Sequence, residues 1–178
     1  ECRPFFIGLL GERYGWVPDR LPEESVSNYG WIQHETGKSI TELEILYGVL
    51  RKEKMKTRAL FCFRDPAFID TVPAAKRSEV LAENLDSHEK LKNLKDAIRE
   101  MDLPSPPLEN YACRYQGLRL NWRLAEQELT ESERNALRPV AEDYIVTPDE
   151  YETLNESLRS KVDGLGIVYL EGLEEFGD

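Results

Sequence analysis

Two carboxylates stand two positions apart in the segment SITELEILYGVLRK, residues 39–52, whose other side chains are mostly apolar. A carboxylate in such a setting can pair with a cation, accept hydrogen bonds at a helix start, or take part in acid–base or electrostatic catalysis. The pattern predicts a helix that is apolar on nearly all sides and is therefore mostly buried. Glu42 and Glu44 are thus the first candidates for chemistry in this chain.

A structural role accounts for Glu42. Ser39 and Glu42 have the S-x-x-E spacing of a capping box. In that motif the serine hydroxyl accepts a hydrogen bond from a backbone N–H in the first turn, and the glutamate accepts one from the serine N–H. The spacing predicts that the helix begins at Ser39 and that Glu42 closes its first turn.

Glu44 has no such role. On a helix it falls on the side of Ile40 and Tyr47, and Gly48 follows one turn later, where it leaves space for a partner or ligand. A carboxylate in a buried position must be paired or line a cleft. Glu44 is therefore either a catalytic or binding carboxylate or one half of an ion pair. The candidate cations for that pair are Arg13, Arg58 and Arg64.

The loop GERYGW, residues 11–16, follows a predicted strand. In open parallel sheets ligands bind beyond the carboxyl ends of the strands. Arg13 could meet an anion, and Tyr14 or Trp16 could stack on a ring. Alternatively, the aromatic side chains pack the loop down and Arg13 pairs with an acid. Together with Ser39, these three residues are the predicted ligand-binding set.

Two continuous apolar runs, FFIGLL (5–10) and RALFCF (58–63), flank the helix 39–52. Such runs are typical of strands covered on both faces, and the order strand–helix–strand predicts a right-handed βαβ unit. An amphipathic helix at 88–101 and a third strand at 111–115 follow. The predicted fold is α/β, with three layers and a parallel sheet of about three strands.

The remaining chain is expected to be helical. The pattern predicts a helix over 117–129, and capping-box spacings at Thr130 with Glu133 and at Thr147 with Glu150 predict two further helix starts. The predicted domains are an α/β part over residues 1–116 and a helical extension over 117–178.

Composition restricts the partners. The 178-residue chain has a formal net charge of -11, which argues against a nucleic-acid binder because such proteins need a basic surface. Three cysteines without paired spacing favour a cytoplasmic protein, and two histidines argue against a His-rich metal site. No apolar run reaches the roughly 20 residues that span a membrane.

The segments RPFFIGLLGERYGW, SITELEILYGVL and RALFCFRDP closely resemble the TIR-like domain upstream of NACHT ATPase modules. That domain occurs in nephrocystin-like, NACHT–WD-repeat and telomerase-associated vault proteins. The resemblance implies a flavodoxin-like fold of which this chain is the C-terminal part, so that a central strand is expected to have an unpaired edge. It also implies that VYLEGLEEFGD leads toward a downstream NACHT module.

The leading functional hypothesis is a signalling or assembly region, an adaptor or effector, of a NACHT-type ATPase protein. It would act through self-association or protein partners, without cofactor, metal, nucleic acid or membrane. The first alternative is an NAD-cleaving effector, because TIR enzymes that cleave NAD use a glutamate on this helix that Glu44 resembles, with Ser39 near the matching serine. The second alternative is a nucleotide sensor without turnover.

Overall fold

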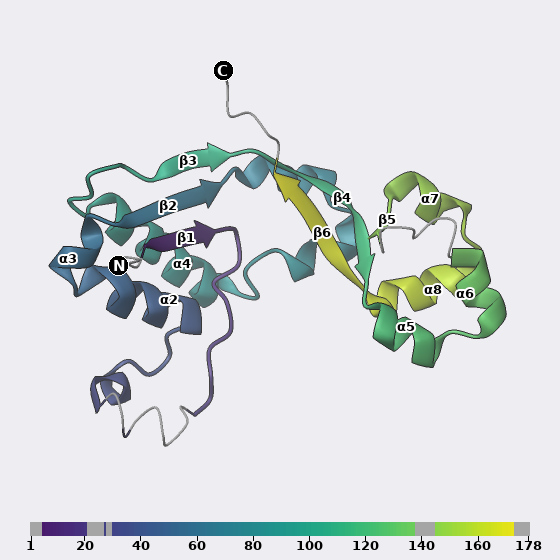
Figure 1. Cartoon of the computed structure of the whole chain (residues 1–178), viewed down its shortest axis with the longest axis horizontal. Helices are drawn as coiled ribbons and strands as arrows, with labels where there is room; N and C mark the ends of the chain where they lie inside the picture. Colours follow the sequence, from purple (N-terminus) through teal and green to yellow (C-terminus); the bar gives the residue numbers. More distant parts are fainter. Residues whose placement is uncertain (1–4, 21–26, 28–29, 138–144, 173–178) are drawn as a thin grey trace. The chain divides into compact units, whose positions relative to one another are not determined.

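The computed structural model describes residues 5–20, 27, 30–137 and 145–172 and divides the chain into two compact units (Figure 1). Unit 1 comprises Glu1–Pro66 and Leu81–Tyr111, and unit 2 comprises Ala67–Val80 and Ala112–Asp178. Each unit therefore contains two separate stretches of the chain.

Unit 1 is built on a parallel three-stranded sheet. Its strands are β1 (Phe6–Leu10), β2 (Ala59–Arg64) and β3 (Leu108–Tyr111), in the order β1-β2-β3 (Figure 1). The predicted α/β fold with a parallel sheet is therefore confirmed. The predicted third strand at 111–115 is wrong in its bounds, because β3 ends at Tyr111 and another strand begins at Cys113.

The helices of unit 1 follow the predicted pattern but differ from it in bounds and in one helix type. After the short η1 (Gly30–His34), the predicted helix 39–52 consists of α2 (Ile40–Ile45) and the π-helical η2 (Leu46–Leu50). The short α3 (Glu53–Lys56) then leads into β2. The predicted helix 88–101 is α4 (Leu85–Arg99), which begins earlier because Asn84 caps it by accepting from the Ser87 N–H at 2.8 Å.

The two faces of the parallel sheet differ. On the inner face, side chains of β1 and β2 such as Leu10, Phe61 and Phe63 form one core with Ile45 and Val49 and with apolar residues of α4. On the outer face, five large apolar side chains are exposed: Phe5 at 77%, Ile7 at 65%, Leu9 at 64%, Leu60 at 43% and Leu108 at 47%. This exposure differs from the expected cover on both faces.

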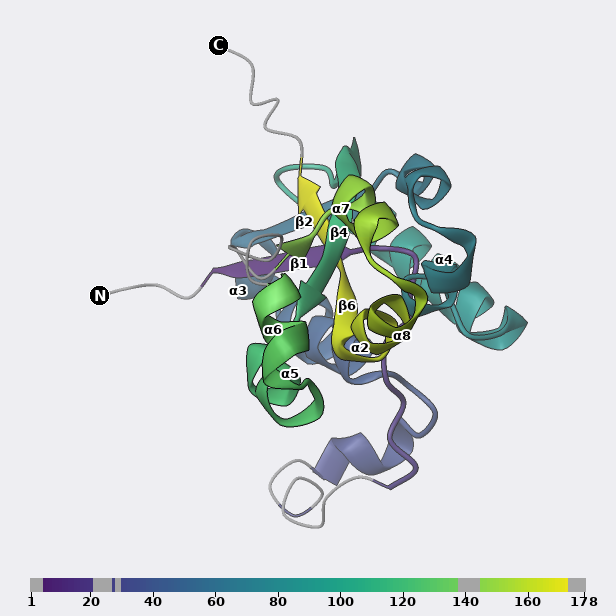
Figure 2. The same cartoon turned by 90° about the vertical axis from the view of Figure 1, so that its right-hand side faces the viewer.

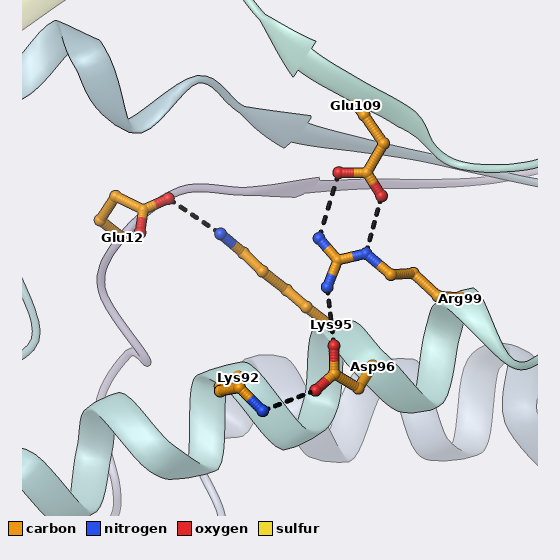
Figure 3. A network of polar contacts seen from close by, with 6 residues as sticks. All are labelled: Glu12, Lys92, Lys95, Asp96, Arg99 and Glu109. Carbon is orange, nitrogen blue, oxygen red and sulfur yellow. Dashed lines mark hydrogen bonds and ion pairs between the residues drawn. The ribbon is translucent and has the colours of Figure 1, made fainter.

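A network of charged side chains fixes α4 to the sheet (Figure 3). Its members are Glu12, Lys92, Lys95, Asp96, Arg99 and Glu109. The largely buried pair Lys95–Glu12, at 2.8 Å, holds the helix to the end of β1, and Arg99 makes two bonds, of 2.7 and 3.1 Å, to Glu109 on β3. The Arg99 guanidinium lowers the pKa of the Glu109 carboxyl. The network therefore sets the position of α4 across the strands.

Unit 2 contains an antiparallel sheet with the order β5-β4-β6. The strands are β4 (Cys113–Leu120), β5 (Ile145–Val146) and β6 (Gly166–Gly172). The first four residues of the predicted helix 117–129 therefore belong to a strand. Leu118 and Leu120 are buried and Arg119 between them is exposed, an alternation with a period of two that suits a strand and not a helix.

Helices cover one face of this sheet (Figure 2). They are α5 (Trp122–Glu128), α6 (Glu131–Leu137), α7 (Pro148–Thr153) and α8 (Glu156–Leu165). The short segments η3 (Pro66–Thr71) and η4 (Ala74–Glu79) come before them in the chain, and Phe68 of η3 packs in a cluster with Tyr115 of β4. Both predicted capping boxes are confirmed, since Thr130 and Glu133 exchange side-chain and backbone hydrogen bonds, as do Thr147 and Glu150.

Candidate functional site

The loop after β1 is held against the start of α2 by Tyr14. This side chain is 3% exposed, and its hydroxyl accepts from the backbone N–H of Ser39 at 3.3 Å. The same hydroxyl donates to a carboxylate oxygen of Glu42. A backbone bond of 3.1 Å from the Ile40 N–H to the Trp16 carbonyl adds a second link. Tyr14 is thus part of the cap of α2.

The predicted capping box at Ser39 is only half formed. The Ser39 hydroxyl accepts from the Glu42 N–H at 3.2 Å, as expected. The Glu42 carboxylate does not return the bond: it accepts from Tyr14 and from the Lys38 ammonium instead. The physical reason is that the Tyr14 hydroxyl already satisfies the Ser39 N–H, which leaves both carboxylate oxygens for other donors.

The two carboxylates differ in burial, and Glu44 does not lie where the sequence predicted it. Glu42 is 8% exposed and hydrogen-bonded, whereas Glu44 is exposed. The expectation that Glu44 lies in an enclosed position is wrong. Its role in NAD cleavage stays a prediction, which nicotinamide release by the Glu44→Gln variant would test.

The other predicted ligand-binding residues do not converge. Arg13 pairs with Glu83, which lies just before α4, and the Trp16 side chain is 72% exposed. The space predicted at Gly48 is filled, because a Cβ atom there would lie 2.8 Å from the Phe6 ring. Of the predicted set, the structure brings together Tyr14 and Ser39, and it does so around Glu42.

An open cleft of about 440 Å³ lies beside this group, between α2–η2 and α4. Tyr14, Lys38 and Glu42 line one part of it, together with Lys90 from α4. Burial, and then the hydrogen bond to Glu42, raises the pKa of Tyr14 to about 12. The hydroxyl therefore stays protonated at neutral pH and keeps donating to the carboxylate.

Sequence reasoning missed the two lysines of the cleft. Lys38 lies just before the start of α2, four residues ahead of Glu42, and the opposite charges of these near neighbours in the sequence could have indicated the pair. The position of Lys90 could not have been predicted from sequence spacing, because its 3.1 Å hydrogen bond to the Gly37 carbonyl joins residues far apart in the sequence.

The groups around this cleft can bind a polar ligand. Within the ranges that the structure describes, no three His, Cys, Asp or Glu side chains are grouped so that they could hold a metal ion. In the same ranges, no helix is both long and apolar enough to cross a membrane. The site offers ammonium groups, a protonated phenol and a compensated carboxylate, which can orient a polar ligand.

The chain is similar to parts of very large proteins. It shares 28% identity over 121 residues with telomerase protein component 1 of Mus musculus and of Rattus norvegicus, which covers 66% of this chain and 4% of each relative. It shares 29% identity over 104 residues with a TPR repeat-containing protein of Dictyostelium discoideum, covering 52% of this chain and 6% of that protein. No protein-family model and no solved structure matches the chain.

These similarities confirm the coarser part of the expected relationship, which is a relation to telomerase-associated proteins. The chain spans only a few per cent of the length of the relatives that it matches. The TIR-like assignment stays a prediction.

Proposed function

We propose that this chain is an assembly region of a large multidomain protein of the NACHT-type ATPase class. It acts by association between protein surfaces and not by catalysis. The similarity to telomerase protein component 1 supports the large-protein context. The position of Glu44 out in solvent, away from the described cleft, favours association over NAD cleavage.

The single observation that carries the proposal is the outer face of the parallel sheet. This face is formed by Phe5, Ile7, Leu9, Leu60 and Leu108. Parallel sheets are normally covered on both faces, and a contiguous apolar patch rimmed by polar residues usually marks an interaction site. In addition, β1 is an edge strand among the described strands, so one row of its backbone groups faces away from β2.

The occupant of this face is a second copy of the chain. All five side chains are uncharged, in a chain whose net charge is -11. Charge repulsion keeps the acidic surfaces of two copies apart, but the copies can approach each other through an uncharged face. A two-fold axis through the face would bring the same apolar side chains together, as in most homodimers. Burial of each large side chain contributes about 1.5–3 kcal/mol before the costs of association.

Sedimentation velocity over a wide concentration range tests the proposal. The wild-type chain is expected to form dimers or larger assemblies, and Ile7→Lys is expected to shift it to monomer. Ile167→Lys is the matched control, because Ile167 on β6 of unit 2 is 64% exposed, against 65% for Ile7. A wild-type chain that stays monomeric throughout, or an equal response of the two variants, contradicts the proposal.

A further inference from the structure

The cleft between α2–η2 and α4 has two chemically different parts. Its apolar wall is made by Leu46, Leu50, Leu94 and Ala97, and its polar part by Tyr14, Lys38, Glu42 and Lys90. The volume of about 440 Å³ lies within the range of roughly 300–1,000 Å³ that is usual for small-molecule sites. Such a cleft suits a ligand with an apolar body and a polar end.

The charge expected on the polar end of the ligand follows from the partners that the charged groups of the cleft already have. Both oxygens of Glu42 are engaged, one by Tyr14 and the other by Lys38. The carboxylate is therefore compensated inside the protein and has little need of a cation from outside. An incoming cation would also have to approach two ammonium groups.

The two lysines have donors to offer. Lys90 donates to the Gly37 carbonyl at 3.1 Å and pairs with Asp86, whose side chain is 72% exposed, at 2.7 Å. The side chains of Lys38 and Lys90 are 33% and 37% exposed. Each ammonium has three N–H donors, more than the bonds just named use. Both can therefore turn toward an anion at the cleft mouth without giving up their present partners.

The backbone of the wall is unusual. Leu46 and Leu50 are the first and last residues of the π-helical segment η2. Such segments make up well under one per cent of residues and occur frequently at functional sites. Here the wider turn begins and ends at the two leucines that line the cleft, so the irregular backbone and the apolar wall coincide.

We propose that this cleft binds a small amphiphilic anion, a compact apolar body that carries one carboxylate, sulfonate or phosphate group. The anionic group lies between Lys38 and Lys90, and the apolar body lies against Leu46, Leu50 and Leu94. This inference does not depend on self-association through the sheet, because all of these residues lie on the helices of unit 1 or on the segment leading into α2.

The test uses a matched pair of fluorescent probes, anilinonaphthalene sulfonate and the uncharged phenylnaphthylamine. The sulfonate is expected to bind the wild-type chain with a stoichiometry of one in the cleft, and Lys38→Gln combined with Lys90→Gln is expected to weaken it about tenfold or more. The uncharged probe should respond much less to that double change. Lys92→Gln, on the same helix but outside the cleft, is the control for charge.

A second variant keeps the test independent of the lysines. Ala97 is exposed on α4, and Ala97→Trp fills the cleft without removing a core residue. It should abolish the binding of both probes there, while Ile7→Lys on the outer sheet face should leave the cleft stoichiometry unchanged. Equal sulfonate affinity in the wild type, the double lysine variant and Ala97→Trp overturns the proposal.

Discussion

The two three-stranded sheets among the described residues differ in which of their faces are apolar. In unit 2, β4 directs Tyr115, Leu118 and Leu120 into the core and Arg114 and Arg119 into solvent. In unit 1, β1 and β2 are apolar on the buried face and also on the exposed face. β4 of the antiparallel sheet therefore has one apolar and one largely polar side, whereas the parallel sheet has two apolar sides.

This difference indicates how each sheet is stabilised. Antiparallel sheets commonly leave one face in water, and the sequence of β4 alternates accordingly. Strands of parallel sheets are normally buried on both faces, and β1 and β2 have the composition of such strands. The exposed side of β4 is therefore suited to water, while the exposed face of the unit 1 sheet carries five large apolar side chains and is suited to a partner. Substitutions on the two sheets should therefore have different effects on stability.

The largest effect is expected at adjacent residues of β2 that face opposite ways. Phe61 is 1% exposed and Leu60 is 43% exposed. Phe61→Ala should lower the free energy of unfolding by about 3–5 kcal/mol because it leaves a cavity in the core. In the monomer, at concentrations too low for self-association, Leu60→Ala should change it by less than about 1 kcal/mol. Hydrogen exchange of the β2 amides measures both, and equal losses would show that the outer face is buried.

A smaller loss is expected in unit 2 at Gly117. This residue has φ +145°, and a Cβ atom there would lie 2.2 Å from the Val146 carbonyl oxygen. Gly117→Ala should destabilise unit 2 by about 2–3 kcal/mol because β5 must move away. Gly164→Ala, within α8, is the control. The new Cβ atom there meets nothing within 4 Å, so this substitution should stabilise the helix by about 0.5–1 kcal/mol. Urea unfolding compares the two, and a stable Gly117→Ala variant would refute the tight β4–β5 approach.

The loop that joins β1 to α2 should show a moderate effect. Tyr14→Phe removes the hydroxyl that joins Ser39 to Glu42 and should cost unit 1 about 1–2 kcal/mol. Because the folded state raises the pKa of Tyr14 to about 12, its stabilising effect is complete below the ordinary value near 10 and is lost as the pH rises to about 12. The difference in unfolding free energy between wild type and variant should therefore shrink over that interval; a constant difference would contradict it.

The smallest effect is expected at a surface pair of unit 2. Contacts with Lys161 and Thr130 lower the pKa of Glu133 to about 2. A lowered carboxyl pKa stabilises the fold above the ordinary value near 4.5, and this stabilisation is lost as the pH falls toward 2. Glu133→Gln should remove that part of the acid sensitivity of unit 2, while Glu131→Gln on the same helix should keep it. Acid titrations followed by circular dichroism distinguish the two variants.

Local patterns predicted the parallel core well. Continuous apolar runs identified β1 and β2, and the spacing of Leu91, Leu94 and Ile98 identified α4. The first part of β4 was missed because GLRLNWRLAEQEL contains helix-favouring residues, although the alternation of Leu118, Arg119 and Leu120 indicates a strand. The antiparallel sheet could not be predicted from local pattern, since β4 pairs with β6 about fifty residues later.

The candidate site shows where a helical pattern stops being informative. The pattern places Glu42 and Glu44 on different sides of α2, but it does not say which side meets the rest of the protein. Tyr14 sets which side is buried. It lies 28 residues before Glu42, donates to the Glu42 carboxylate and accepts the hydrogen bond from the Ser39 N–H. In the same way Phe6 fills the space beside Gly48. Contacts between residues distant in the sequence set both outcomes.

The division into units has a practical consequence for the design of shorter fragments of this chain. The polypeptide changes unit after Pro66, after Val80 and after Tyr111. A fragment that stops at Tyr111 would carry Phe68 and Val72 without Tyr115, with which they form an apolar cluster. A fragment that starts at Ala112 would lack those two residues. Neither half can be expressed intact by simple truncation, so a separate unit would have to be obtained by rejoining its two stretches with a new linker.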